Sequence, residues 1–248
     1  MTQHLNISIG YDSKEPLTLE VLSHSIIKRA SKPVSIIPIA LNHLKEVYTR
    51  EDRAGTTEFS LTRFLTPYLS NYRGWSLFLD SDMIVQCDVY DIFNAVTTHG
   101  HDGKSVYVVK HDYRPAMGAK ATGPQTDYPR KNWSSVMLFN NASCRMLTPG
   151  YVNTATPAQL HRFVWVDDSA LGSLPVEWNQ LVGEYEPNPD AKILHYTLGA
   201  PCFPGYEDSA EADAWWNEHN SMCAPLKTYQ WGYAEMFTRE LPRHPVVG

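Results

Sequence analysis

The sequence is poor in cysteine, and the spacing of its cysteines excludes two common uses of that residue. Cys87, Cys144, Cys202 and Cys223 lie far apart and form no C-x-x-C pair, which argues against a structural zinc site and a disulfide framework. No apolar run reaches the ~18 residues of a membrane span, and the chain does not open with a basic stretch followed by an apolar one. We therefore expect no transmembrane segment and no secretory signal, and a reducing, cytoplasmic location fits best.

Positive charge is also scarce. Lysine and arginine number 21 against 27 aspartates and glutamates, which gives a formal net charge of −6. Nucleic-acid binders present a surplus of basic side chains, so we expect no nucleic-acid partner. Hydrophobic residues make up 43 % and charged residues 19 % of the chain, which excludes disorder as its main state. Since no repeat, low-complexity segment or linker interrupts the sequence, we expect a single domain over residues 1–248.

Strand and helix patterns alternate along the chain. Apolar and β-branched runs predict strands at 5–9, 34–37, 75–79, 105–109, 136–139 and 192–196. Apolar residues at helical spacing predict helices at 15–30 and 58–72, and Pro67 should kink or weaken the second of these. Such alternation favours an α/β fold with a mainly parallel sheet flanked by helices.

Two aspartates follow the most apolar strand directly. Ligands of open α/β sheets bind beyond the carboxyl ends of the strands, and Asp80 and Asp82 fall at such an end. A divalent cation would relieve the repulsion between their carboxylates. The alternative is a strand-terminal turn in which the aspartates cap backbone N–H groups.

His195 ends another apolar run and precedes a loop rich in glycine and proline, residues 199–205. Two carboxylates and a neutral imidazole suit Mn²⁺ better than Ca²⁺ or a metal that requires thiolates. A structural histidine with its hydrogen bonds satisfied is the alternative.

Taken together, these pieces resemble glycosyltransferase family 8, whose members have the GT-A fold and include glycogenin and bacterial lipopolysaccharide galactosyl- and glucosyltransferases. The resemblance covers most of the chain and rests on an ordered set of segments rather than on any single one. They are residues 7–12 (ISIGYD), 60–64 (SLTRF), 78–82 (FLDSD), 134–140 (SSVMLFN), 167–168 (DD) and 194–196 (LHY). The resemblance implies a nucleotide-binding part in about 1–110 and an acceptor and catalytic part in about 111–248.

The resemblance implies a metal-dependent transfer of a hexose from a nucleotide-diphosphate sugar, a UDP-sugar, to an acceptor hydroxyl, with retention of configuration. Asp80, Asp82 and His195 would hold Mn²⁺, with Mg²⁺ as the alternative, and the cation would stabilise the departing diphosphate. Ser81 and Gly199 would lie beside this group. The acceptor would be a saccharide, a lipid-linked glycan or a small molecule.

Further residues of the donor site follow from the same resemblance. Tyr11 and Asp12 resemble positions that hold the uridine, with an ordinary turn as the alternative. Arg63 lies where the family places a basic residue against the donor phosphate or sugar, with a surface salt bridge as the alternative.

Asp167 and Asp168 match the family's D-Q-D region only in part, because Asp168 replaces the glutamine and Ser169 the second aspartate. Asp168 could act as a carboxylate nucleophile, accept a hydrogen bond from a sugar hydroxyl or cap a helix. If the reaction inverts, Asp167, Asp168 or Asp112 could serve as the general base.

The loop after His195 also departs from the family, since it lacks the lysine that assists the leaving phosphate. Candidate substitutes are the backbone N–H groups around Gly199 and the side chains of Lys110, Arg130 and Lys131. His111 follows the same strand as Lys110 and could meet the donor sugar or the acceptor.

Two other functions remain open. A phosphatase of the haloacid-dehalogenase type also places an aspartate pair after an apolar strand, although Asp167 and Asp168 have no preceding glycine. A sugar-nucleotide-binding protein without turnover would fit the missing lysine and the altered acidic pair.

Overall fold

The computed structural model describes residues 4–51, 57–97, 103–112, 119–120, 123–124 and 129–224. The chain opens with a β-α-β unit made of β1 (Leu5–Gly10), α1 (Pro16–Arg29) and β2 (Val34–Ile39), as the sequence predicts. Pro16 occupies the first turn of α1, where its missing N–H costs no hydrogen bond. Strands β1 and β2 pair in parallel along their whole length.

The central sheet has six strands in the order β2-β1-β3-β8-β5-β9. The remaining strands are β3 (Trp75–Leu79), β5 (Val106–Val109), β8 (Val136–Asn140) and β9 (Leu171–Leu174). Neighbouring strands are parallel except at β8, which is antiparallel to both β3 and β5. A mainly parallel sheet is therefore confirmed, whereas β9 is a strand that the sequence pattern did not predict.

A second, smaller sheet joins β10 (Gln180–Leu181), β11 (Ile193–His195) and β4 (Met83–Val85). The strand predicted at 192–196 is present as β11, but it pairs antiparallel with β4 instead of joining the central sheet. Two further short strands, β6 (Ala119–Lys120) and β7 (Gly123–Pro124), pair antiparallel with each other.

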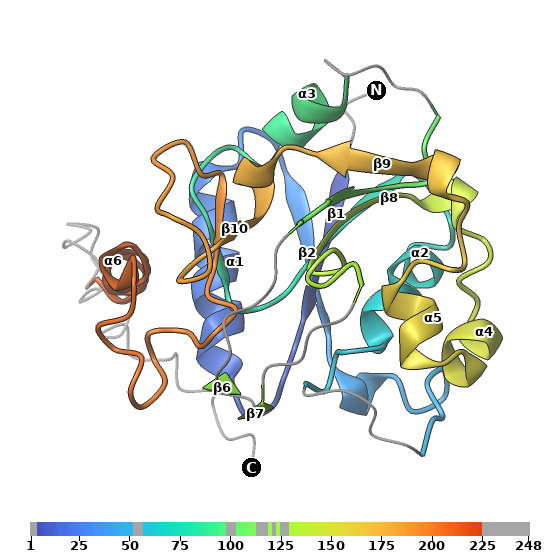
Figure 1. Ribbon diagram of the computed structural model, residues 1–248, viewed down its shortest axis with the longest axis horizontal. Helices are drawn as coiled ribbons and strands as arrows, with labels where there is room; N and C mark the ends of the chain where they lie inside the picture. Colours follow the sequence, from blue (N-terminus) through green and yellow to red (C-terminus); the bar gives the residue numbers. More distant parts are fainter. Residues whose placement is uncertain are drawn as a thin grey trace, which may run out of the picture.

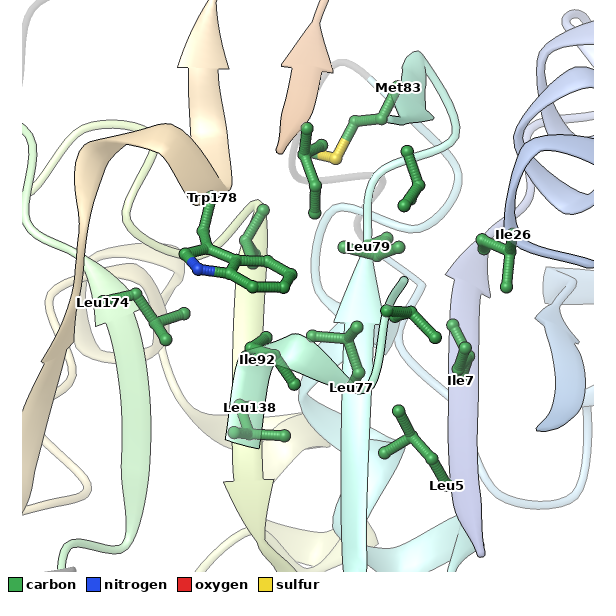
Figure 2. Packing of buried hydrophobic residues seen from close by; sticks show 14 of the residues in the cluster. Leu5, Ile7, Ile26, Leu77, Leu79, Met83, Ile92, Leu138, Leu174 and Trp178 are labelled. Atoms are coloured by element: carbon green, nitrogen blue, oxygen red, sulfur yellow. The ribbon is translucent and has the colours of Figure 1, made fainter. Parts of the chain in front are cut away.

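Alternation along the central strands sends side chains to two apolar layers. Leu77 and Leu79 face a layer that contains Ile26 of α1, and Figure 2 shows them between Ile7 and Leu138. Phe78 faces the other way, into a layer with helices α2, α4 and α5, which Figure 1 shows grouped together away from α1. Both faces of the sheet are thus covered, as its continuous apolar strands require.

The helices on and around these layers are short except for α1 and α6. Their bounds are α2 (Thr66–Leu69), α3 (Asp91–Thr97), α4 (Pro149–Thr154), α5 (Pro157–His161) and α6 (Ala212–Cys223). Single 3₁₀ turns occur at η1 (Leu41–His43), η2 (Thr62–Leu65), η3 (Asn141–Ser143), η4 (Asp168–Ala170) and η5 (Val176–Asn179). Among the described residues, no helix combines the length and the apolar character that a membrane crossing needs.

The long helix predicted at 58–72 is wrong. The segment forms η2 and then α2, and it ends where Asn71 and Tyr72 adopt positive φ angles of 51° and 54°. Pro67 lies in the first turn of α2, so it begins a helix instead of kinking the middle of one. The apolar spacing correctly predicted which side chains are buried, but the proline inside the segment divides it into two short helical turns.

Candidate metal and donor site

The segment Asp80–Asp82 connects the two sheets, because β3 ends at Leu79 and β4 begins at Met83. The Asp80 N–H donates to the carbonyl oxygen of Ser135 at 3.1 Å, which extends the pairing of β3 with β8. The carbonyl oxygen of Asp82 accepts from the N–H of Tyr196 at 2.9 Å, which extends the pairing of β4 with β11. Both ends of this short segment are therefore fixed by sheet hydrogen bonds.

Pairing of β4 with β11 brings His195 to the two aspartates. Met83 is aligned with His195, so the imidazole lies beside the residue that precedes Met83. One ligand atom from each of Asp80, Asp82 and His195 lies within 4.8 Å of the other two, and His195 Nε2 is 3.3 Å from Asp82 Oδ1. The Asp82 side chain is 24 % exposed and that of His195 only 2 %. The predicted convergence of these three side chains is confirmed.

Arg63 lies buried behind Asp80. Its Nη1 is 2.7 Å from Asp80 Oδ1 and donates to the carbonyl oxygen of Ser134 at 2.9 Å, while its Nε donates to that of Ser60 at 3.1 Å. The guanidinium also lies over the ring of Phe78, 5.1 Å from its centroid. The Arg63 side chain is 7 % exposed, so this pair is not the surface salt bridge that the sequence left open.

Behind His195 lies a polar network that sequence patterns did not reveal. Asn179, which is fully buried, has its Oδ1 2.9 Å from His195 Nδ1 and its Nδ2 2.9 Å from His111 Nε2. His111 Nδ1 is 2.9 Å from the hydroxyl of Tyr185. Burial, with a smaller contribution from the charge of His195, lowers the pKa of His111 to about 3. His111 therefore faces the buried network as a neutral imidazole.

Glu15 is another residue near the acidic pair that the sequence patterns did not identify. It directly precedes α1, and burial raises its pKa to about 7, with smaller contributions from the negative charges of Asp82 and Asp12. Burial is thus the main reason that this carboxyl group resists ionisation, and the negative charges of the nearby aspartates add to it. Its position in the loop that follows β1, three residues after Asp12, could have identified it as a candidate site residue.

The residues predicted to hold the nucleotide lie in loops at the ends of β1 and β3. Tyr11 is partly exposed, whereas Asp12 is buried and accepts from the backbone N–H groups of Lys14 and Glu58. The bond from Lys14 belongs to the ordinary turn that the sequence left as the alternative, whereas the bond from Glu58 joins this loop to a segment 46 residues away. Ser81 is 1 % exposed, and its hydroxyl makes no hydrogen bond to the rest of the described chain.

Gly199 is held tightly in the loop after β11. Its N–H donates to the carbonyl oxygen of Tyr196 at 2.9 Å, and a Cβ at this position would lie 2.8 Å from the ring of Tyr206. Only glycine therefore fits here without a shift of the aromatic ring.

Asp167 and Asp168 precede the amino-terminal end of β9, where Leu171 is aligned with Val106. Strand β9 runs in the same direction as β3, and Asp80 follows the carboxyl end of β3. The two acidic pairs thus adjoin opposite ends of their strands. The Asp168 side chain is 76 % exposed and forms an ion pair with Arg130 at 2.7 Å, and the Asp167 side chain makes no helix-capping bond.

Two candidate substitutes for the missing lysine are engaged within the chain. Lys110 Nζ donates to the carbonyl oxygen of Leu171 at 2.9 Å, and Arg130 binds Asp168 and lies over the ring of Trp133. Lys131 is buried, with 5 % of its surface exposed.

Solved structures with a similar fold are glycosyltransferases of the GT-A fold. The apo structure of the bifunctional glycosyltransferase WbbM superimposes with a TM-score of 0.62 at 18 % identity, over 88 % of this chain and 50 % of that chain. This chain thus spans half the length of WbbM. The galactosyltransferase LgtC, in complex with donor and acceptor sugar analogs, gives a TM-score of 0.52 at 10 % identity, over 90 % of this chain and 98 % of that chain. This protein therefore has a GT-A-like fold, as predicted.

Similarity in sequence identifies the family. No family model matches the chain. Protein CDI of Arabidopsis thaliana is 43 % identical over 223 residues, which cover 86 % of this chain and 85 % of the plant protein. Identity at this level over most of both sequences means that this chain belongs to the same protein family as Protein CDI.

Proposed function

We propose that this protein is a glycosyltransferase that moves a hexose from a UDP-sugar to an acceptor hydroxyl, with retention, using Mn²⁺ held by Asp80, Asp82 and His195. Mg²⁺ is the alternative cation. The observation that carries the proposal is the convergence of these three side chains, within 4.8 Å of one another, at the carboxyl end of β3 in a GT-A-like fold. Ligands of open α/β sheets bind at such an end.

The donor set fits a borderline divalent cation. Two carboxylates and one imidazole match the mixed oxygen and nitrogen coordination of Mn²⁺, whereas Mg²⁺ prefers oxygen ligands alone. The cation, when bound, would act as a Lewis acid on the diphosphate and contribute several kcal/mol of transition-state stabilisation. It would also explain how a chain with a net charge of −6 binds an anionic donor.

The chain's own residues would orient the donor. Arg63 holds Asp80 in place through the ion pair at 2.7 Å. Tyr11, which is partly exposed, would stack its ring on the uracil, which is worth about 1–3 kcal/mol by analogy with base–aromatic contacts. Ser81 lies between the two aspartates, and Gly199 lies in the loop that follows His195.

The roles of Asp167 and Asp168 stay predictions. A carboxylate that attacks the donor sugar should lose nearly all kcat on replacement by asparagine, with little change in KM. An exposed partner of Arg130 should show almost no change in either constant. Steady-state kinetics of Asp167→Asn and Asp168→Asn therefore separate these two roles, and the exposed position of Asp168 favours the second.

Calorimetric titration of UDP with and without Mn²⁺ tests the proposed metal site. We expect Asp82→Ala and His195→Ala each to abolish the gain in UDP affinity that Mn²⁺ provides. Asp208→Ala and His43→Ala, which alter exposed residues of the same types, should leave it unchanged. Undiminished Mn²⁺-assisted binding in either site variant would remove that residue from the coordination shell.

Release of UDP from UDP-sugars in the presence of Mn²⁺ tests the activity. Slow hydrolysis of at least one UDP-hexose is expected, since water can replace the acceptor. Binding of UDP without release over hours would instead indicate a binding protein without turnover. Hydrolysis of p-nitrophenyl phosphate with Mg²⁺ would indicate the phosphatase.

A further inference from the structure

Asn179 lies buried between His195 and His111, at the end of η5. We propose that Asn179 is a positioning residue that keeps a proton on His195 Nδ1, so that the lone pair of Nε2 faces Asp82. The part of this inference that concerns metal affinity rests on the proposed function, whereas the part that concerns the proton position does not.

A backbone carbonyl group fixes the direction of the hydrogen bonds at one end of this network. Ser135 Oγ lies 2.7 Å from the carbonyl oxygen of Asn132, which can only accept, so the single hydroxyl proton of Ser135 is donated there. Asn179 approaches the same Oγ at 2.8 Å. Because the hydroxyl proton is already used, Asn179 must be the donor in this contact, and its NH₂ group must face Ser135.

Two other contacts agree with this orientation of the amide. Asn179 Nδ2 is 2.9 Å from His111 Nε2 and 3.4 Å from the carbonyl oxygen of Asn132. A reversed amide would direct its oxygen at Asn132's carbonyl oxygen and at a hydroxyl with no proton to give. Since Asn179 and Ser135 are 0 % and 2 % exposed, the groups cannot turn to water instead.

With its NH₂ group turned to Ser135, Asn179 must present its oxygen to His195. The Oδ1 atom lies 2.9 Å from His195 Nδ1, and an amide oxygen can only accept. His195 Nδ1 therefore carries a proton whatever Nε2 carries. In the neutral imidazole Nε2 is then unprotonated, 3.3 Å from Asp82 Oδ1, and its lone pair is available to a cation shared with the carboxylate.

Loss of this acceptor would free the imidazole to take the other tautomer. A proton on Nε2 would then occupy the position that faces Asp82, and it would have to leave before a metal could bind. Outer-shell partners of metal-ligating histidines generally change metal affinity about 10–100-fold when they are replaced. We expect an effect in this range for Asn179.

The experiment compares four replacements in the full chain. Asn179→Leu removes the acceptor at similar volume, whereas Asn179→Asp keeps an oxygen for His195 Nδ1–H and removes the donors to Ser135 and His111. Asn42→Leu makes the same change at an exposed site. Ser135→Ala is the second test variant should Asn179→Leu fail to fold, because it removes the contact that orients the amide.

The first measurement is made on metal-free protein. Nitrogen-15 spectra of histidine-labelled protein at alkaline pH, assigned with His195→Gln, should show His195 protonated on Nδ1 in the wild type, Asn179→Asp and Asn42→Leu. A second tautomer should be populated in Asn179→Leu and, to a smaller extent, in Ser135→Ala. Protonation of wild-type His195 on Nε2, or an unchanged spectrum in Asn179→Leu, would overturn the inference.

The second measurement is Mn²⁺ binding, followed by the loss of the signal of free Mn²⁺ in electron paramagnetic resonance. Asn179→Leu should bind about 10–100-fold more weakly than the wild type, and Asn179→Asp within a few-fold of it. Equal affinities for the wild type and Asn179→Leu would refute the effect on metal binding. Should the wild type bind no Mn²⁺ while its tautomer is as expected, the proposed function fails and the role of Asn179 stands.

Discussion

Replacing Arg63 by methionine would remove the positive charge that lies against Asp80 while keeping most of the side-chain volume. The change breaks the ion pair with Asp80 at 2.7 Å and leaves the carbonyl oxygens of Ser60 and Ser134 without this donor. Because Arg63 and Asp80 are only 7 % and 14 % exposed, water cannot fully replace the lost contacts. We therefore expect a large loss of stability.

The size of this loss can be worked from the contacts. Removing one partner of a buried ion pair costs about 3–5 kcal/mol, because the other charge is left buried. The Asp80 side chain retains some contact with solvent, so we place the cost of Arg63→Met near the lower limit, at about 3 kcal/mol. In Arg63→Met/Asp80→Asn the uncompensated charge is gone, and part of the stability should return.

Urea unfolding followed by circular dichroism measures the free energies of unfolding of the wild type, both single variants and the double variant. We expect a coupling energy of about 1–3 kcal/mol between the two positions. The matched control Arg73→Met, at an exposed arginine, should stay within about 0.5 kcal/mol of the wild type. A cost below about 1 kcal/mol for Arg63→Met, or no coupling to Asp80, would refute the reasoning.

Three further predictions concern the packing of the fold. Gly10→Ala should destabilise the protein by about 1–3 kcal/mol, because the new Cβ would overlap the ring of Phe59. An unchanged urea midpoint would contradict this. Burial lowers the pKa of His161 to about 3, so the unfolded chain binds a proton below about 6.5 while the folded chain does not. The free energy of unfolding should then fall as pH decreases from 6.5 toward 3, by up to about 1.4 kcal/mol per pH unit. Urea titrations of His161→Asn should lack this part of the pH dependence. Glu218→Gln weakens the 2.6 Å bond from Arg29 that joins α6 to α1, and a loss of about 1–3 kcal/mol is expected in thermal melts. The control Glu20→Gln, at an exposed glutamate of α1, should cause no change.

The acidic pair and the histidine could be found in the sequence because each follows an apolar run. Local hydrophobicity predicts where a strand ends, and ligands of α/β sheets bind at strand ends. The same patterns correctly predicted β1, α1, β2 and β3. They failed at 58–72, where helical spacing of apolar residues described a buried face but not the turn that divides it.

Short strands, and contacts between segments that are distant in the sequence, could not be predicted from these patterns. β4 has only three residues, and β10 only two, so neither gives a periodic signal. Asn179 carries no local sign of a role, since a single asparagine between Trp178 and Gln180 is compatible with any turn. Its contacts with His195 and Ser135 come from segments far away along the chain.

By itself, the amino-acid sequence determined the α/β alternation, the apolar core strands and the residues able to ligate a metal, because periodicity and side-chain chemistry are local properties. Only the tertiary structure decided that β11 pairs with β4, which sets His195 beside Asp82, and that Arg63 lies behind Asp80. It also decided that Asp168 pairs with Arg130 at the start of β9. These relations depend on strand order and register, which are settled by the packing of the whole sheet and not by any one segment.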